Sequence, residues 1–146
     1  FIGHLQSNKV GIVAPLATSI HSVDSLRLLQ KVCGRVERKL SIFLEVNIDA
    51  EPNKAGFTPG DLLSMLPQLA HTIALGSNVE VSGLMAIPSA TGDVRGAFRR
   101  LRELENKCRP LTHGALSMGM SGDFEIALEE GATHVRVGSS IFGARA

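Results

Sequence analysis

Segments with strand-like and helix-like hydrophobic patterns alternate along most of this chain. Apolar residues that recur every three or four positions indicate helices, and short apolar runs bounded by turn residues indicate strands. The predicted strands are residues 17–22, 41–48, 79–87, 115–119 and 134–137, with residues 1–3 as the end of a sixth. The predicted helices are residues 7–16, 24–38, 59–71, 93–108 and 122–130. Strands that are joined in sequence by helices run parallel, so the alternation predicts a parallel α/β sheet.

Two architectures satisfy this alternation, an open doubly wound sheet and a closed (β/α)8 TIM barrel. A barrel needs eight strand–helix units and typically about 250 residues, whereas about six units occupy the 146 residues here. The first residue is Phe1 and not methionine, and the chain starts as if inside a strand. We therefore expect a single domain, residues 1–146, that forms an incomplete TIM-type barrel without its first strands. Its open sheet edges predict self-association of this chain, and a monomer is expected at full length.

Capping residues support the predicted helix boundaries. Thr58 precedes Pro59 at the first helical position, which is typical of a helix N-terminus. Gly131 follows the helix at 122–130, where a C-terminal glycine is common. The helix at 93–108 places one apolar stripe on a single face, made of Val94, Ala97, Phe98, Leu101, Leu104 and Cys108.

Composition and spacing exclude several classes of function. The formal net charge is +1 and the basic residues are interspersed with acids, which argues against a nucleic-acid partner. No apolar stretch reaches the roughly 18 residues of a membrane span. Cys33 and Cys108 show no metal or disulfide spacing and predict reduced thiols in a cytoplasmic protein. The histidines show no ligand spacing and Ser117 lies outside a G-x-S-x-G motif, so no metal and no serine nucleophile are predicted.

Small-residue turns follow the last two predicted strands. They are Ser121-Gly122 and Gly138-Ser139-Ser140, and a helical pattern starts at each. Backbone N–H groups at a helix start are unpaired and carry partial positive charge, so hydroxyls and glycines there can surround a phosphate. In TIM barrels the loops after the last two strands often form a phosphate site. The turns therefore predict a phosphate ligand at the carboxyl edge of the sheet.

Motifs in five regions, in order along the whole chain, resemble those of the pyridoxal phosphate homeostasis protein family. They are FIGHLQSNK at 1–9, LEVNI with KAG at 44–48 and 54–56, GLMAIP at 83–88, LSMGMS at 116–121 and VRVGSSIFG at 135–143. That family shares the fold of the alanine racemase N-terminal domain. The resemblance implies a barrel that binds pyridoxal 5'-phosphate (PLP), handles the vitamin B6 pool and has no established turnover of its own.

The resemblance also implies which residues bind the cofactor. Ser121, Gly138 and Ser139 would bind the phosphate, with Ser139 in place of a residue that is often threonine. Arg136 would face the pyridine nitrogen. A guanidinium only donates hydrogen bonds, so it would keep that nitrogen unprotonated and weaken the electron-withdrawing ring. This property suits a carrier, or a racemase-like step, better than extensive carbanion chemistry.

Four more residues are candidate cofactor contacts. Gly3 and His4 end the strand predicted at residues 1–3, on the expected ligand face, and an exposed turn residue is an equal alternative for His4. Asn47 and Met118 lie on strands that border the site, although packing is the commoner role for a methionine.

The family's Schiff-base lysine lies on the first barrel strand, upstream of Phe1, and is therefore expected to be absent from this chain. Lys54 follows a strand on the ligand face and could contact the ligand or form an imine, but a structural or solvent-exposed role is favoured.

The sequence thus predicts a non-catalytic carrier or regulator that binds PLP or a related B6 phosphate. Two alternatives remain open. One is a PLP racemase or decarboxylase of the alanine racemase fold type, and the other is a module on a flavodoxin-like sheet that binds a different phosphate ligand.

Overall fold

Residues 1–76 and 78–143 are described by the computed structural model, which contains a parallel α/β sheet. The strands are β1 (Ser19–Val23), β2 (Leu40–Val46), β3 (Val79–Ala86), β4 (Ala115–Met120) and β5 (His134–Arg136), and they lie in the sheet in this order. The helices are α1 (Val10–Val13), α2 (Leu26–Cys33), α3 (Pro59–Leu75), α4 (Val94–Lys107), α5 (Phe124–Glu129) and α6 (Ser139–Phe142). In the described part of the chain no helix is long and apolar enough to cross a membrane.

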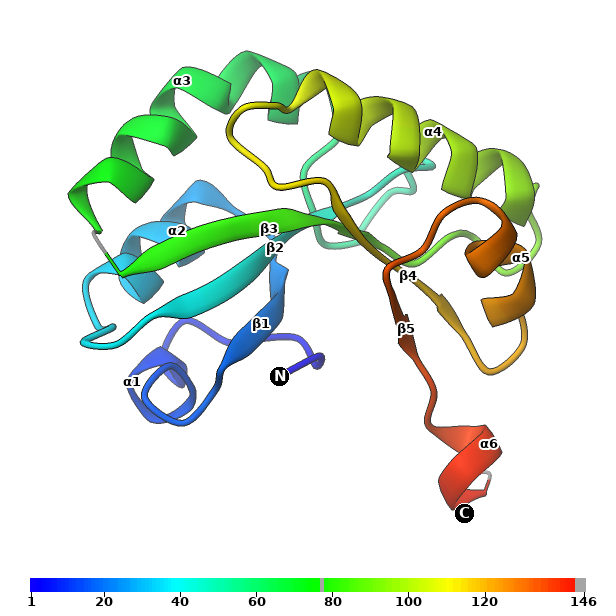
Figure 1. The fold of residues 1–146 in the computed structure, drawn as a ribbon, viewed down its shortest axis with the longest axis horizontal. Helices are drawn as coiled ribbons and strands as arrows, with labels where there is room; N and C mark the ends of the chain where they lie inside the picture. Colours follow the sequence, from blue (N-terminus) through cyan, green and yellow to red (C-terminus); the bar gives the residue numbers. More distant parts are fainter. Residues whose placement is uncertain (77, 144–146) are drawn as a thin grey trace.

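The sheet is strongly curled. In Figure 1 it forms an arch with α3 and α4 on the outer side, while the N-terminus and α6 lie toward the inner side. His21 Nδ1 on β1 lies 2.8 Å from Ser117 Oγ on β4, although two strands separate β1 from β4 in the sheet. Neighbouring strands are about 4.8 Å apart, so these side chains can meet only across a bent sheet. The structure therefore confirms the predicted incomplete barrel.

The N-terminal segments differ from the prediction. Residues 1–3 form no sixth strand, because only Phe1 pairs with the edge of β1: its amino group donates to Ser19 O at 2.7 Å, and His21 N donates to Phe1 O at 2.9 Å. The first two helices are also shorter than the predicted ranges 7–16 and 24–38. Ser25 starts α2 by accepting a hydrogen bond from Leu28 N at 3.3 Å.

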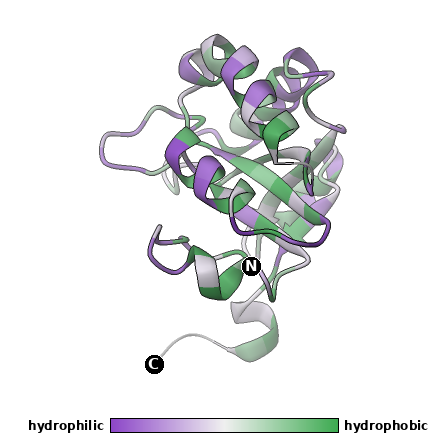
Figure 2. Cartoon of the chain, turned by 90° about the vertical axis from the view of Figure 1, so that its left-hand side faces the viewer, coloured by the Kyte–Doolittle hydropathy of each residue, from purple (hydrophilic) through white to green (hydrophobic). Residues whose placement is uncertain are grey.

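The two faces of the sheet carry different kinds of residue. The outer face is aliphatic and packs against the helices, with Ile42, Leu44 and Leu84 fully buried. The apolar stripe predicted for α4 covers this face, and Ala97, Phe98, Leu101 and Leu104 are buried. The cartoon in Figure 2 shows hydrophilic residues along the helices and predominantly hydrophobic residues in the visible strands. The inner face instead carries His21, Phe43 and Ser117, with Met85 beside them.

Gly119 bends β4 just before the first of the two small-residue turns. Its φ is +94°, and the pairing of β4 with β5 shifts register between Ser117 and Met120, which is the pattern of a β-bulge. A Cβ at Gly119 would lie 2.6 Å from Ala127 Cβ on α5. Glycine therefore lets the strand pass close to α5 and redirects the chain toward Ser121.

The substitution Gly119→Ala is expected to lower the free energy of unfolding by about 2 kcal/mol, because the added methyl group meets α5 and the positive φ is unfavourable for alanine. Gly122→Ala is the matched control, since a Cβ at Gly122 meets no atom within 4 Å. Urea unfolding of both variants measures the difference. Equal stabilities would show that the bulge accommodates a side chain.

Candidate functional site

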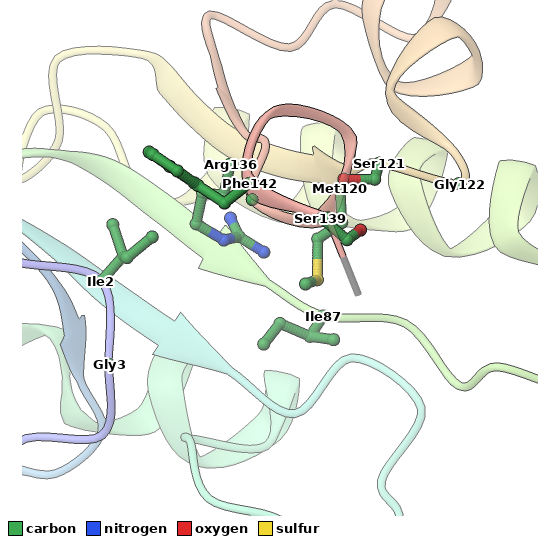
Figure 3. Close-up of a pocket in the computed structure, with 11 residues that line it drawn as sticks. Ile2, Gly3, Ile87, Met120, Ser121, Gly122, Arg136, Ser139 and Phe142 are labelled. Atoms are coloured by element: carbon green, nitrogen blue, oxygen red, sulfur yellow. The ribbon is translucent and has the colours of Figure 1, made fainter. Parts of the chain in front are cut away.

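A cavity of about 660 Å³ opens at the carboxyl-terminal edge of the sheet, on its inner side. This volume lies within the roughly 300–1,000 Å³ of small-molecule sites, and parallel sheets bind ligands at this edge. The lining residues come from the N-terminal segment, the ends of β3, β4 and β5 and the final helix (Figure 3): Ile2, Gly3, Ile87, Met120, Ser121, Gly122, Arg136, Gly138, Ser139, Phe142 and Gly143. The structure thus brings together Gly3, Ser121, Arg136, Gly138 and Ser139 from the predicted set.

The other three predicted contacts, His4, Asn47 and Met118, do not line this cavity. His4 Nδ1 lies 3.6 Å from Asp24 Oδ2. The Asn47 amide is used within its own loop, where it donates to Glu51 O at 2.9 Å and accepts from Glu51 N at 3.0 Å. Met118 lies in the core on the helix-facing side of β4, because successive strand residues face opposite sides. Ligand contacts by these three residues stay predictions.

The two small-residue turns lie side by side at the cavity. Ser140 N donates to Ser121 Oγ at 3.3 Å, which joins the turn after β4 to the turn after β5. A Cβ at either Gly122 or Gly138 would meet no atom within 4 Å, so the backbone of both turns faces open space. Hydroxyl groups and accessible glycine backbone are the donors that a phosphate monoester requires.

Arg136 reaches the same cavity from the inner face of β5 with only 7% of its surface exposed. Nη1 donates to Ser117 O and to Ser117 Oγ, both at 2.8 Å, and Nη2 donates to Ala86 O at 3.0 Å. Within the described part of the chain, these bonds use three of the five N–H donors of a guanidinium. Figure 3 shows the guanidinium directed into the space among the lining residues. Burial lowers the pKa of Arg136, but a guanidinium keeps its charge in proteins.

Behind Arg136, the inner face carries an aromatic cluster around His21. The His21 ring lies against Phe43, with centroids 4.2 Å apart, and meets His134 edge-on at 5.6 Å. Burial lowers the pKa of His21 to about 4, and repulsion from His134 and Arg136 acts in the same direction. His21 is therefore a neutral hydrogen-bonding group at neutral pH.

Glu45 adds an acidic group to the inner face. Burial raises the pKa of the Glu45 carboxyl, and the neighbouring charge of Asp24 raises it further, while His4, Arg136 and Lys54 act in the opposite direction. Among the described residues, no group of three or more His, Cys, Asp or Glu side chains is placed to hold a metal ion.

Sequence reasoning assigned no role to His21 or Ser117. Neither residue belongs to a metal-ligand spacing or a nucleophile motif, and such motifs do not depend on which face of a strand a residue occupies. Both residues are on the inner face, and in β4 Ser117 alternates with apolar residues that face the helices. Alternation of polar and apolar residues within the strands was the signal that could have identified them.

Lys54 is held by its own loop and by the rim of the cavity. Nζ donates to Glu51 Oε1 and to Ile87 O, both at 2.7 Å. Because Ile87 lines the cavity and Lys54 does not, these contacts agree with the structural role that the sequence favoured.

The fold and the cavity together define an incomplete β/α barrel with a cavity of small-molecule size at the carboxyl edge of its sheet. The profile of the alanine racemase N-terminal domain matches residues 3–146. The chain is 42% identical to the pyridoxal phosphate homeostasis protein of Pseudomonas aeruginosa, over 99% of this chain and 64% of the relative. It is 41% identical to the protein of the same name from Aquifex aeolicus, over 99% and 66%. The chain therefore spans just under two thirds of these relatives.

The chain is also similar to solved structures. PipY of Synechococcus elongatus without PLP is 36% identical, with a TM-score of 0.85 over 97% of this chain and 68% of PipY. PipY with PLP bound is 34% identical, with a TM-score of 0.81 over the same shares. The chain belongs to the alanine racemase N-terminal domain family, among the pyridoxal phosphate homeostasis proteins.

Proposed function

We propose that this chain binds PLP in the cavity at the carboxyl edge, as part of a protein that carries the cofactor or regulates its supply without turning it over. The observation that carries the proposal is the meeting of two phosphate-type turns with a buried arginine around one cavity. Two facts about the relatives support it: PipY has been solved with PLP bound, and the bacterial relatives are named for PLP homeostasis.

The lining residues fit the two ends of PLP. The hydroxyls of Ser121 and Ser139, with the backbone around Gly138, supply donors for the phosphate. The remaining N–H groups of Arg136 supply a donor for the ring nitrogen. Bound PLP provides an electron-withdrawing ring, and this property depends on protonation of the ring nitrogen. Arg136 cannot give up a proton, so it leaves the nitrogen unprotonated, which suits storage and delivery.

The described residues that line the cavity include no lysine. We therefore propose that they hold PLP through its phosphate and ring, without a covalent bond to the aldehyde. The free thiols of Cys33 and Cys108 are compatible with the reducing environment of the cytoplasm, which is the location we propose.

The substitution Ser139→Asp is expected to weaken PLP binding roughly tenfold or more, because a carboxylate in this turn repels the phosphate. Ser64→Asp makes the same change at an exposed position on α3 and should leave the affinity unchanged within about twofold. Isothermal titration calorimetry with PLP measures both. If the two variants bound PLP equally well, the phosphate would have to lie away from Ser139.

A further inference from the structure

Three side chains on the inner face form one continuous chain of hydrogen bonds. Arg136 Nη1 lies 2.8 Å from Ser117 Oγ, and Ser117 Oγ lies 2.8 Å from His21 Nδ1. Ser117 is completely buried, and His21 is 8% exposed. This series of hydrogen bonds starts at Arg136 on β5, beside the cavity. It continues through Ser117 on β4 and ends at His21 on β1.

The chemistry of the three groups gives these hydrogen bonds a direction. Arg136 only donates, so Ser117 Oγ accepts from it. The single hydroxyl proton of Ser117 then goes to His21 Nδ1, and the proton of the neutral imidazole lies on Nε2. The lowered pKa of His21 agrees with this assignment, because a protonated ring could not accept at Nδ1. Each group in the series thus fixes the hydrogen-bonding role of the next.

Contacts at both ends of this hydrogen-bond series fix the orientation of the Arg136 guanidinium. His21 is packed against the Phe43 ring, so it can hold the Ser117 hydroxyl in one rotamer. Ser117 holds Nη1, and Ala86 O holds Nη2 at 3.0 Å from the neighbouring strand. A guanidinium that is hydrogen-bonded at both Nη1 and Nη2 has a fixed plane, so its remaining N–H groups keep a fixed direction.

We propose that Ser117 and His21 are positioning residues for Arg136, and that they set the preference of the site for aromatic phosphate monoesters with an unprotonated ring nitrogen. The inference rests on the proposed function because it concerns the same cavity. It adds a source of selectivity. The two turns bind any phosphate monoester, whereas the Arg136 guanidinium, oriented by Ser117 and His21, favours ligands with a ring nitrogen.

Two probes separate these contributions. Pyridoxine 5'-phosphate has the ring nitrogen but no aldehyde, and benzyl phosphate has an aromatic ring and a phosphate without the nitrogen. Ser117→Ala and His21→Phe remove the hydrogen bonds, whereas Ser117→Thr and His21→Asn keep a hydrogen-bonding group at each position. We expect Ser117→Ala and His21→Phe each to lose roughly tenfold in affinity for pyridoxine 5'-phosphate and less than about twofold for benzyl phosphate. The affinities of Ser117→Thr and His21→Asn for the two probes should stay within about threefold of those of the unsubstituted chain.

Equal losses for the two probes would assign the pair a structural role and overturn the inference, as would unchanged affinities in Ser117→Ala and His21→Phe. If the unsubstituted chain bound both probes equally, the site would not recognise the ring nitrogen and the inference would be overturned, whereas a chain that bound neither PLP nor pyridoxine 5'-phosphate would overturn the proposed function itself. Nitrogen-15 NMR of the Arg136 side chain gives a second readout without ligand. Restricted rotation of the guanidinium in the unsubstituted chain and faster rotation in whichever of the two variants folds would support the inference. Equal rotation would overturn it.

Discussion

Replacing Arg136 with methionine is expected to lower the affinity for pyridoxine 5'-phosphate roughly 30- to 100-fold. Methionine occupies a similar length of the inner face but offers no donor, so the ring nitrogen would be desolvated without a partner. Ser117 O would also lose the hydrogen bond from Arg136 Nη1, and Ala86 O the one from Nη2. Isothermal titration calorimetry measures the affinity, and urea unfolding measures the accompanying loss of stability.

Two comparisons identify the cause of that loss. Benzyl phosphate should lose less than about fivefold in Arg136→Met, because it has no ring nitrogen and loses only the attraction of a positive charge. Arg136→Lys keeps the charge but replaces a planar fork with a single ammonium group, so an intermediate loss of about tenfold for pyridoxine 5'-phosphate is expected. Equal losses of both probes in Arg136→Met would show that Arg136 acts on the phosphate through its charge.

Much of the fold could be predicted from local chemistry. Thr58 caps α3 as predicted, accepting from Asp61 N at 3.2 Å with Pro59 in the first turn, and Gly131 follows α5 with a φ of +97°. These signals act within a few residues of the chain, so they are readable from sequence. The short length of α1 was not readable in this way, since helix length depends on the surface that a helix can cover after the sheet has curled.

The candidate site likewise contains some features that local sequence predicts and others that depend on the folded sheet. Small residues after β4 and β5 marked the turns at Ser121 and Gly138, because a turn at a helix start is a local feature. The bond between Ser117 and His21 joins residues 96 positions apart, and it exists only because the sheet bends. No local pattern encodes such a contact. Strand alternation does reveal which residues face inward, but not which of them meet.

Acidification is expected to destabilise the folded chain through His21. Its pKa is about 4 in the folded chain against an ordinary value of 6.5, mainly because the ring is buried. Between these two pH values the unfolded chain binds one more proton at this position than the folded chain, so stability rises with pH across the interval. The free energy of unfolding should therefore fall by up to about 3 kcal/mol as the pH drops from about 7 to about 4.

His21→Phe isolates this contribution, because it keeps an aromatic ring against Phe43 and removes the titrating group. Glu45 titrates with the opposite sign, since burial raises its pKa and protonation then favours the folded state. The pKa of Glu130 is lowered by hydrogen bonds from Arg99 and Arg95, so its contribution to stability is lost as the pH falls from its ordinary pKa through the lowered one. Both carboxyls remain in the variant, so the difference between the urea-unfolding curves of the two proteins reports His21 alone. A difference that stayed constant between about pH 7 and about pH 4 would mean that the His21 imidazole carries its proton as readily in the folded chain as in the unfolded one, and that burial does not lower its pKa.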